Sequence, residues 1–269
     1  MKFSLEILGS GTSVGVPVIG CACAVCTSTD PRNNRLRSSA LVRGYDGGGQ
    51  LETTVIIDTA PDFRQQMLRA RVQKLDGVII THYHADHVVG IDDVRRFNSI
   101  QKRVIDLWAT PETLASLRRS FGYVFQESGD VRPGLPCLRA RTISLGEPFE
   151  IGNLRFEPLE LDHFVMKTLG FRIRCGDSRT LSYCLDVKTI PPATFDALQG
   201  TDTLVLDMLR EKAHPTHMNL EEALAATGRI QPRRTYFAHI AHEVEHAALE
   251  AALPPGVRLA YDGLLIEMD

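Results

Sequence analysis

The 269-residue sequence lacks an apolar run long enough to cross a lipid bilayer, which excludes a transmembrane helix. It also lacks the hydrophobic segment of a secretion signal, because Ser4 and Glu6 interrupt the apolar residues near the N-terminus and Gly9 ends them. Neither sign of charge dominates, since 30 basic and 33 acidic side chains leave a net charge of −3. We therefore expect a cytoplasmic protein that has no membrane partner and no nucleic-acid partner.

Cysteine is also scarce. The sequence contains six cysteines, and three of them lie close together at Cys21, Cys23 and Cys26. A cluster with an odd number of thiols is a poor disulfide framework, and in a reducing compartment it favours a metal site. A structural zinc site needs four ligands in a closed tetrahedron, so this segment lacks one ligand. Three free thiols in a surface loop are the alternative interpretation.

Short apolar runs alternate with helical patterns along both halves of the sequence. We expect strands at residues 3–8, 53–58, 78–80, 104–108, 149–161, 169–175, 180–185, 203–207 and 235–238, with a last pair within 258–268. We expect helices at residues 61–71, 111–121, 191–198, 219–227 and 243–252. This alternation predicts an α/β fold with two sheets and helices outside them. No linker divides the sequence, so residues 1–269 are expected to form one domain.

The segment His82-Tyr83-His84-Ala85-Asp86-His87 carries the strongest functional signal. Its four candidate ligands directly follow the strand predicted at residues 78–80. A turn at the end of a strand can direct such side chains to one point, whereas a regular helix or strand would separate them. Imidazole nitrogens and carboxylate oxygens are suitable ligands for Zn, Mn or Fe. A polar surface loop rich in histidine is the alternative.

The pattern Thr81-His82-x-His84-x-Asp86-His87 resembles the signature of the metallo-β-lactamase superfamily. The resemblance implies an αββα four-layer sandwich, in which helices cover the outer faces of two mixed β-sheets. His163, Asp186 and His239 each follow an apolar run, at the places where this superfamily has its remaining ligands. The implied catalytic centre holds two metal ions: one bound by His82, His84 and His163, the other by Asp86, His87 and His239, with Asp186 bridging them.

The cysteine cluster adds a second resemblance. Residues 15–26 resemble the phosphodiesterases of the PhnP type, and PqqB-type proteins carry a similar cysteine segment. The PhnP type is known for a structural zinc ion bound by such a cysteine trio and a later histidine. The resemblance implies His242, three residues after His239, as the fourth ligand beside Cys21, Cys23 and Cys26. The zinc would then connect the N-terminal loop to the loop that carries His239.

The residues around the third ligand favour one branch of the superfamily. Leu161-Asp162-His163-Phe164 departs from the Gly-His-Thr-x-Gly pattern of thioesterases and lactamases, and it resembles the RNase Z and PhnP branch, whose substrates are phosphodiesters. That branch has a catalytic histidine at the place of His217, which would protonate the leaving oxygen. Asp86 would bind metal and orient the attacking water. We interpret His214 and His246 as surface residues.

The resemblance therefore implies a metal-dependent hydrolase of a small phosphodiester, such as a cyclic ribose phosphate, with two divalent ions at the active site and one structural zinc. RNase Z activity itself is disfavoured, because no counterpart of its long tRNA-binding arm is evident and the chain is not basic. Two alternatives stay open: a PqqB-like protein of cofactor biosynthesis, and a hydrolase of carboxylic esters, thioesters or lactones. Relatives of this branch imply a homodimer.

Overall fold

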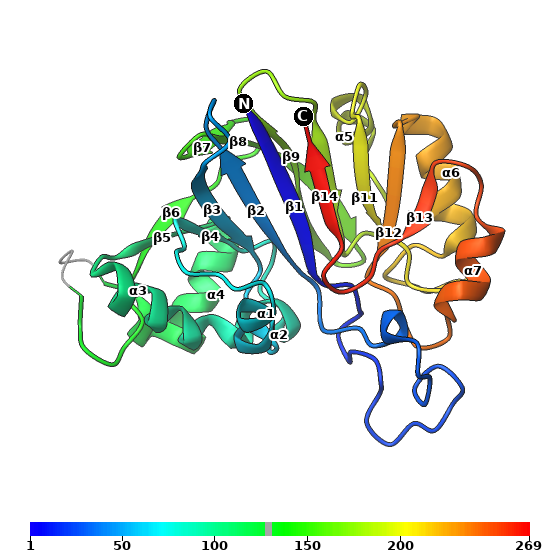
Figure 1. The fold of residues 1–269 in the computed structure, drawn as a ribbon, viewed down its shortest axis with the longest axis horizontal. Helices are drawn as coiled ribbons and strands as arrows, with labels where there is room; N and C mark the ends of the chain where they lie inside the picture. The colour runs from blue at the N-terminus through cyan, green and yellow to red at the C-terminus, as the bar shows by residue number, and fades with distance from the viewer. Residues whose placement is uncertain (127–130) are drawn as a thin grey trace.

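The computed structural model describes residues 1–126 and 131–269, and the strands in these residues form two seven-stranded sheets (Figure 1). The first sheet contains, in spatial order, β14 (Leu265–Met268), β1 (Lys2–Gly9), β2 (Ser39–Tyr45), β3 (Leu51–Ile57), β4 (Gly77–Ile79), β5 (Ile105–Ala109) and β6 (Leu138–Thr142). The second contains β13 (Val257–Leu259), β12 (Arg234–Ala238), β11 (Thr203–Asp207), β10 (Leu181–Cys184), β9 (Met166–Cys175), β8 (Leu154–His163) and β7 (Phe149–Ile151).

Both sheets are mixed, as the sequence predicts. The first is antiparallel from β14 to β3 and parallel from β3 to β6. The second is parallel from β13 to β10 and antiparallel from β10 to β7. The parallel strands β3 and β4 therefore end on the same edge of one sheet, and β10, β11 and β12 end together on an edge of the other. Polar side chains that follow these strands can meet there.

Helices cover the outer face of each sheet. The helices that connect strands of the first sheet are α1 (Phe63–Arg69), α2 (Ala85–Val88), α3 (Arg95–Gln101) and α4 (Pro111–Phe121), with the short 3₁₀ helices η2 (Val89–Val94) and η3 (Gly122–Val124). The second carries α5 (Pro192–Ala197), α6 (Leu220–Ile230) and α7 (His246–Ala252). The 3₁₀ helix η1 (Pro31–Asn33) lies in the loop that follows β1. None of the helices in the described part of the chain is both long and apolar enough to span a membrane.

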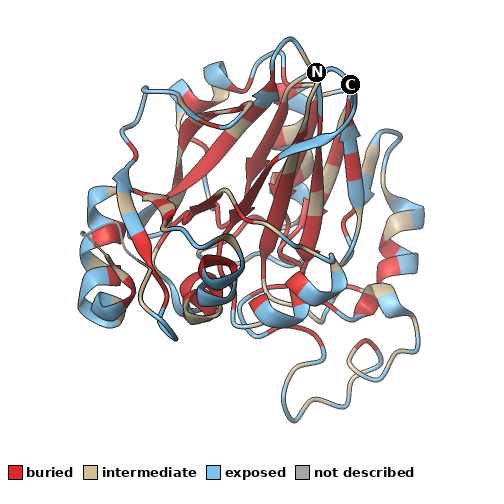
Figure 2. Ribbon diagram, turned by 60° about the vertical axis from the view of Figure 1, so that its left-hand side comes forward, coloured by how far each residue is buried: buried red, intermediate tan, exposed pale blue. Residues whose placement is uncertain are grey.

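Three hydrophobic clusters separate the four layers. The central cluster joins inward side chains of both sheets, such as Val42 and Phe171. A second cluster packs the outer face of the first sheet against Phe63 of α1 and Leu117 of α4. A third packs the second sheet against α6 and α7, where Leu249 is buried. Figure 2 shows that buried residues line the strands of both sheets. The predicted αββα sandwich is confirmed.

Some predicted boundaries differ from the structure. The single strand expected at residues 149–161 is a hairpin, because the chain turns at Gly152, where φ is +57° and an added Cβ would lie 2.0 Å from Thr53 Oγ1. The helix expected from residue 243 begins at His246, with Glu245 as its N-cap. By contrast, α4 has the predicted bounds, and α6 begins with a capping box formed by Asn219 and Glu222.

His246 is not a surface residue, so that interpretation is wrong. Its side chain is 1% exposed, and its ring lies edge-to-face on Tyr261 at a centroid distance of 6.1 Å. The first turn of α7 packs against the loop around η1, where Asn33 Oδ1 accepts a hydrogen bond from the His246 backbone N–H. Burial, together with the nearby charges of Arg32 and Arg35, lowers the pKa of His246 to about 4.

Because His246 is buried with a lowered pKa, we expect the free energy of unfolding to fall in acid. Between pH 6.5 and pH 4 the unfolded chain binds a proton at His246 that the folded chain does not, so the free energy of unfolding falls as the pH falls. The contribution reaches about 3 kcal/mol near pH 4. Urea unfolding of wild type and His246→Leu across this range measures it. The difference in unfolding free energy between the two proteins should change with pH; a constant difference would show that the imidazole does not titrate in this way.

Candidate metal centre

The predicted ligands lie at the ends of strands, on turns with unusual backbone conformations. His82 lies three residues beyond β4, and His163 is the last residue of β8. Asp186 and His239 follow β10 and β12, and their φ angles are +53° and +63°. Left-handed backbone is uncommon for residues with a side chain and concentrates at functional sites. These two turns therefore redirect the chain just where a ligand follows a strand.

All seven predicted ligands of the catalytic centre come together, although they are far apart in the sequence. In each of several groups, one possible ligand atom per residue lies within 4.8 Å of the others. These groups are His82, His84 and His163; Asp86, His87 and His239; His82, His87 and Asp186; and His163, Asp186 and His217. The first two groups match the two predicted triads. Asp186 belongs to one group with His82 and His87 and to another with His163 and His217. The arrangement suits two neighbouring cations with a carboxylate between them.

Asp186 lies between two histidines in the buried centre. Its Oδ2 atom is 3.3 Å from His87 Nε2, and its Oδ1 atom is 3.3 Å from His239 Nε2. Asp86 Oδ2 is also 3.3 Å from His87 Nε2. Among the described residues, several of these buried atoms have no hydrogen-bond partner: His82 Nε2, His87 Nε2, His239 Nε2 and Asp186 Oδ2. Buried polar atoms are rarely left unpaired, so a cation among them fits this donor set.

The outer nitrogens of three histidines are held by neighbours. His87 Nδ1 lies 2.7 Å from Asp58 Oδ2, and His163 Nδ1 lies 2.9 Å from the Thr216 carbonyl oxygen. His82 Nδ1 lies 3.0 Å from the Thr81 hydroxyl. Such contacts fix the orientation of each ring and leave its Nε2 atom for a metal ion. Sequence reasoning assigned no role to Asp58, although a carboxylate directly after a buried strand was a usable signal.

The surroundings hold several of the predicted ligands, though not His87, in the protonation states that bind metal. Burial lowers the pKa of both His82 and His239. Burial also favours the neutral form of Asp86 and Asp186. The neighbouring His87 and His239 oppose this effect and lower the pKa of both carboxyl groups below the usual range. Neutral imidazoles and ionised carboxylates are the forms that coordinate divalent cations. Burial also disfavours protonation of His87, but Asp186 and Asp58 raise its pKa, so its surroundings favour positive charge.

His217 lies at the edge of this centre. Its ring is stacked on that of His239, with a centroid distance of 4.4 Å and an interplanar angle of 18°, and its centroid lies 4.7 Å from that of His163. Its Nδ1 atom is 2.8 Å from Asp207 Oδ2. Burial acts to lower the pKa of His217, but Asp207 raises it above its ordinary value. Asp207, the last residue of β11, is a second orienting carboxylate to which sequence reasoning gave no role.

His214 lies beside this edge but outside the groups of candidate ligands described above. Its Nδ1 atom accepts a hydrogen bond from the Thr216 backbone N–H at 3.3 Å, and its centroid is 5.4 Å from that of His217. It is partly exposed. Its contacts are therefore those of a loop residue that supports the turn before His217.

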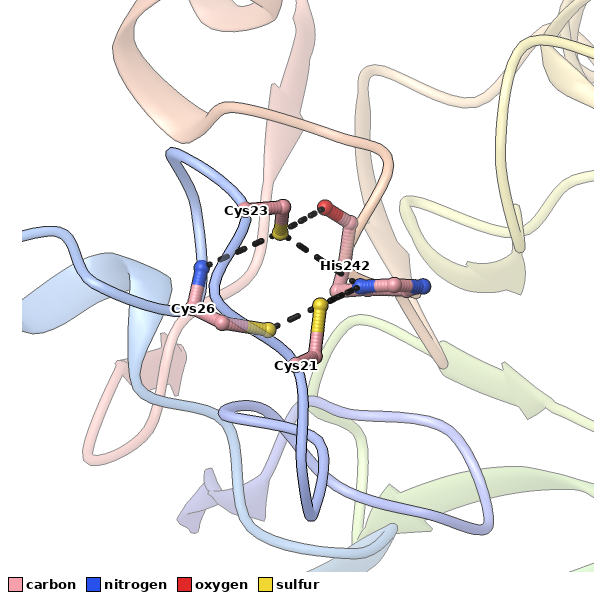
Figure 3. Close-up of side chains that lie close together, drawn as sticks. All are labelled: Cys21, Cys23, Cys26 and His242. Atoms are coloured by element: carbon pink, nitrogen blue, oxygen red, sulfur yellow. Dashed lines mark hydrogen bonds between the residues drawn. The ribbon is translucent and has the colours of Figure 1, made fainter.

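The three clustered cysteines and His242 also come together, as a separate group of candidate metal ligands. Figure 3 shows Cys21, Cys23 and Cys26 around the His242 ring. Their sulfur atoms lie 3.4, 3.5 and 3.6 Å from His242 Nδ1. A tetrahedral zinc ion with ordinary bond lengths would separate a sulfur from a nitrogen ligand by about 3.5 Å. The Cys26 backbone N–H, with smaller contributions from neighbouring side chains, lowers the pKa of Cys23 to about 6, which favours the thiolate.

Known proteins are similar to this chain over most of its length. A family model described as the Beta-lactamase superfamily domain matches residues 53–240. An octanoyltransferase of Porphyromonas gingivalis is 36% identical over 96% of this chain; the chain spans only 50% of that protein. A coenzyme PQQ synthesis protein B of Methylorubrum populi is 31% identical over 75% of this chain and 71% of its own length.

Solved structures extend these similarities. A diphosphatase from the PhnP family has a TM-score of 0.88 and 39% identity, covering 99% of this chain and 97% of that one. The short form of human tRNase Z has a TM-score of 0.70 with 15% identity, covering 98% of each chain, which is a similarity of fold alone.

Proposed function

Because this chain belongs to the metallo-β-lactamase superfamily, we propose that it is a hydrolase of a small phosphodiester. Two divalent cations would bind at the catalytic centre formed by the seven predicted ligands, and a structural zinc would bind at the cysteine cluster. The observation that carries the proposal is the convergence of His163, Asp186 and His239 on the turn at residues 82–87. Buried ligand atoms without partners support it. Their nitrogen and oxygen donors suit Zn, Mn or Fe.

The proposed chemistry divides between the cations and the side chains of the chain. Two bound cations would supply Lewis acidity at the phosphoryl oxygens and lower the pKa of a coordinated water. Asp86, whose side chain is 14% exposed, is placed to orient the attacking water. His217 donates a proton to the leaving oxygen from Nε2, while Asp207 holds Nδ1. The water oxygen would form a new bond to phosphorus as the P–O bond to the leaving group breaks; the proton from His217 completes the leaving alcohol, and the proton lost by the water passes to solvent.

The choice of a phosphodiester rests on residues beside His163 and on one close relative. Asp162 and Phe164 flank this ligand, where thioesterases have the glycine and threonine of Gly-His-Thr-x-Gly. The PhnP-family diphosphatase, similar over nearly the whole chain, also cleaves a phosphoric linkage according to its name. A thioesterase is the second candidate, because one relative is called an octanoyltransferase. Octanoyl groups are transferred between carriers as acyl derivatives rather than as phosphodiesters.

A substrate panel separates these functions. The metal-loaded protein is assayed with a cyclic ribose phosphodiester, a nucleoside diphosphate ester, an octanoyl thioester and a lactone. Turnover of the phosphodiester with kcat/KM at least about 10²-fold above that of the thioester is expected. Turnover of the thioester or lactone alone would overturn the assignment. Metal analysis of the same sample is expected to give about three ions per chain.

Replacement of Cys23 tests the structural zinc. Cys23→Ser removes one of four ligands, so the zinc content should fall by about one ion per chain while the two catalytic ions remain. The midpoint of thermal unfolding should fall, because binding of a structural metal stabilises the folded chain. Cys175→Ser is the matched control, since its buried thiol lies outside the cluster. An unchanged zinc content in Cys23→Ser would mean that the cysteines are free thiols.

A further inference from the structure

The loop after β12 serves both candidate metal sites. His239 lies at its start and joins the catalytic centre, and His242, three residues later, joins the cysteine cluster. A shift of this loop would therefore move a ligand of each site. Ile240 pairs with the segment after β1, because its N–H donates to the Ser10 carbonyl and its carbonyl accepts from Thr12 N–H. The backbone on either side of His242, however, is held by hydrogen bonds from the side chain of Arg35.

Arg35 holds both sides of His242. Its side chain is 1% exposed, which is rare for arginine. The guanidinium donates hydrogen bonds to the carbonyl oxygens of Ala241 and Val244, both at 2.9 Å. A third hydrogen bond, at 3.0 Å, goes to the Asn33 side chain. Arg35 itself is fixed by paired backbone hydrogen bonds of 2.8 Å with Val16, which lies just ahead of the cysteines.

The charge of Arg35 lacks a direct partner of opposite sign. Its contacts among the described residues include no carboxylate. Burial lowers the pKa of Arg35 to about 10, which still leaves the side chain charged at neutral pH. A buried charge without a partner is strongly unfavourable unless other groups compensate it. Carbonyl dipoles and more distant carboxylates, Asp262 first and then Glu245 and Asp30, supply this compensation.

We infer that Arg35 is a positioning residue for both metal sites: its hydrogen bonds to the backbone on both sides of His242 fix the loop at residues 239–244. This inference rests on the proposed function, because it takes both clusters to bind metal. It assigns no contact with substrate to Arg35. Its effect on catalysis passes through His239, whose own nitrogens have no hydrogen-bond partner among the described residues. Outer contacts of this kind change metal affinity by about 10- to 100-fold in other sites.

The test compares two substitutions of Arg35 with a matched arginine elsewhere. Arg35→Met removes the charge and all three hydrogen bonds, and Arg35→Lys retains the charge but cannot reach both carbonyls as a fork. Arg43→Met is the control, because Arg43, in β2 of the first sheet, is also largely buried and donates to a backbone carbonyl, that of Ala70 at the end of α1. Zinc affinity is measured by competition with a chelator. The cobalt-substituted proteins report the thiolate site through its charge-transfer absorption and the catalytic site through its ligand-field bands.

The expected result is a 10- to 100-fold loss of zinc affinity at the cysteine cluster in Arg35→Met, with altered ligand-field bands, a smaller loss in Arg35→Lys and none in Arg43→Met. Equal zinc affinity and spectra in wild type and both Arg35 variants would overturn the inference and leave Arg35 a packing residue. If Arg35→Met fails to fold, Arg35→Lys decides alone. The metal readouts require no substrate, so a wrong substrate assignment would fail in the panel without affecting this result.

Discussion

Substitution of Asp186 by asparagine is expected to lower kcat/KM by at least about 10³-fold and to reduce the metal content from about three ions per chain towards one. Asp186 is the carboxylate that belongs to candidate groups on both sides of the centre, and its two oxygens lie 3.3 Å from His87 and His239. An amide keeps the shape but removes the negative charge. A loss of this size corresponds to about 4 kcal/mol in the barrier, within what two cations contribute.

The matched control is Asp162→Asn. Asp162 lies next to His163, but its carboxylate contacts Lys167 and Thr189 on the exposed side of the hairpin. This variant should retain its metal and most of its activity. The zinc at the cysteine cluster should remain in both proteins, because neither residue contacts it. Full metal content and near wild-type turnover in Asp186→Asn would show that the carboxylate does not bridge two catalytic ions.

The convergence of the candidate ligands could be predicted from the local pattern at residues 82–87 and from the family resemblance, which implied His163, Asp186 and His239. The four candidate ligands at residues 82–87 are consecutive or nearly so, and strand ends bring distant residues together at one edge of a sheet. The layers of the fold were predictable for a related reason: central strands such as β3 and β11 are buried on both faces and appear as continuous apolar runs. The caps of α4 and α6 carry their own local signals in Thr110-Pro111 and Asn219.

Other features of the structure depend on contacts between residues far apart in the sequence, which no local sequence pattern indicates. Asp58 and Asp207 orient histidines that lie 29 and 10 residues further along the chain, so their roles appear only once the sheets form. The burial of His246 depends on packing against the loop near Asn33, more than 200 residues earlier. β6 was not predicted because only Leu138 of its five residues is buried, which leaves no alternation to detect.

Replacement of His217 by alanine is expected to lower kcat by about 10²- to 10⁴-fold for a phosphodiester with an alkoxide leaving group. The same change should have little effect on a p-nitrophenyl phosphodiester, since its leaving group departs without a proton. Asp207→Asn should produce a smaller loss with the same dependence on leaving group, because it only releases Nδ1 of the ring. His214→Ala is the comparison, because its ring lies beside that of His217 but outside the groups of candidate ligands described above, so its loss should lower kcat much less.

This experiment also distinguishes a proton donor from a metal ligand. One possible ligand atom of His217 lies within 4.8 Å of those of His163 and Asp186, so coordination is the competing role. A ligand would be required for both substrates, and its loss would lower the catalytic metal content. A proton donor would be required for one substrate, with all metal retained. Asp207, which raises the pKa of His217, favours the second outcome, because a protonated imidazole can donate a proton and cannot bind a cation.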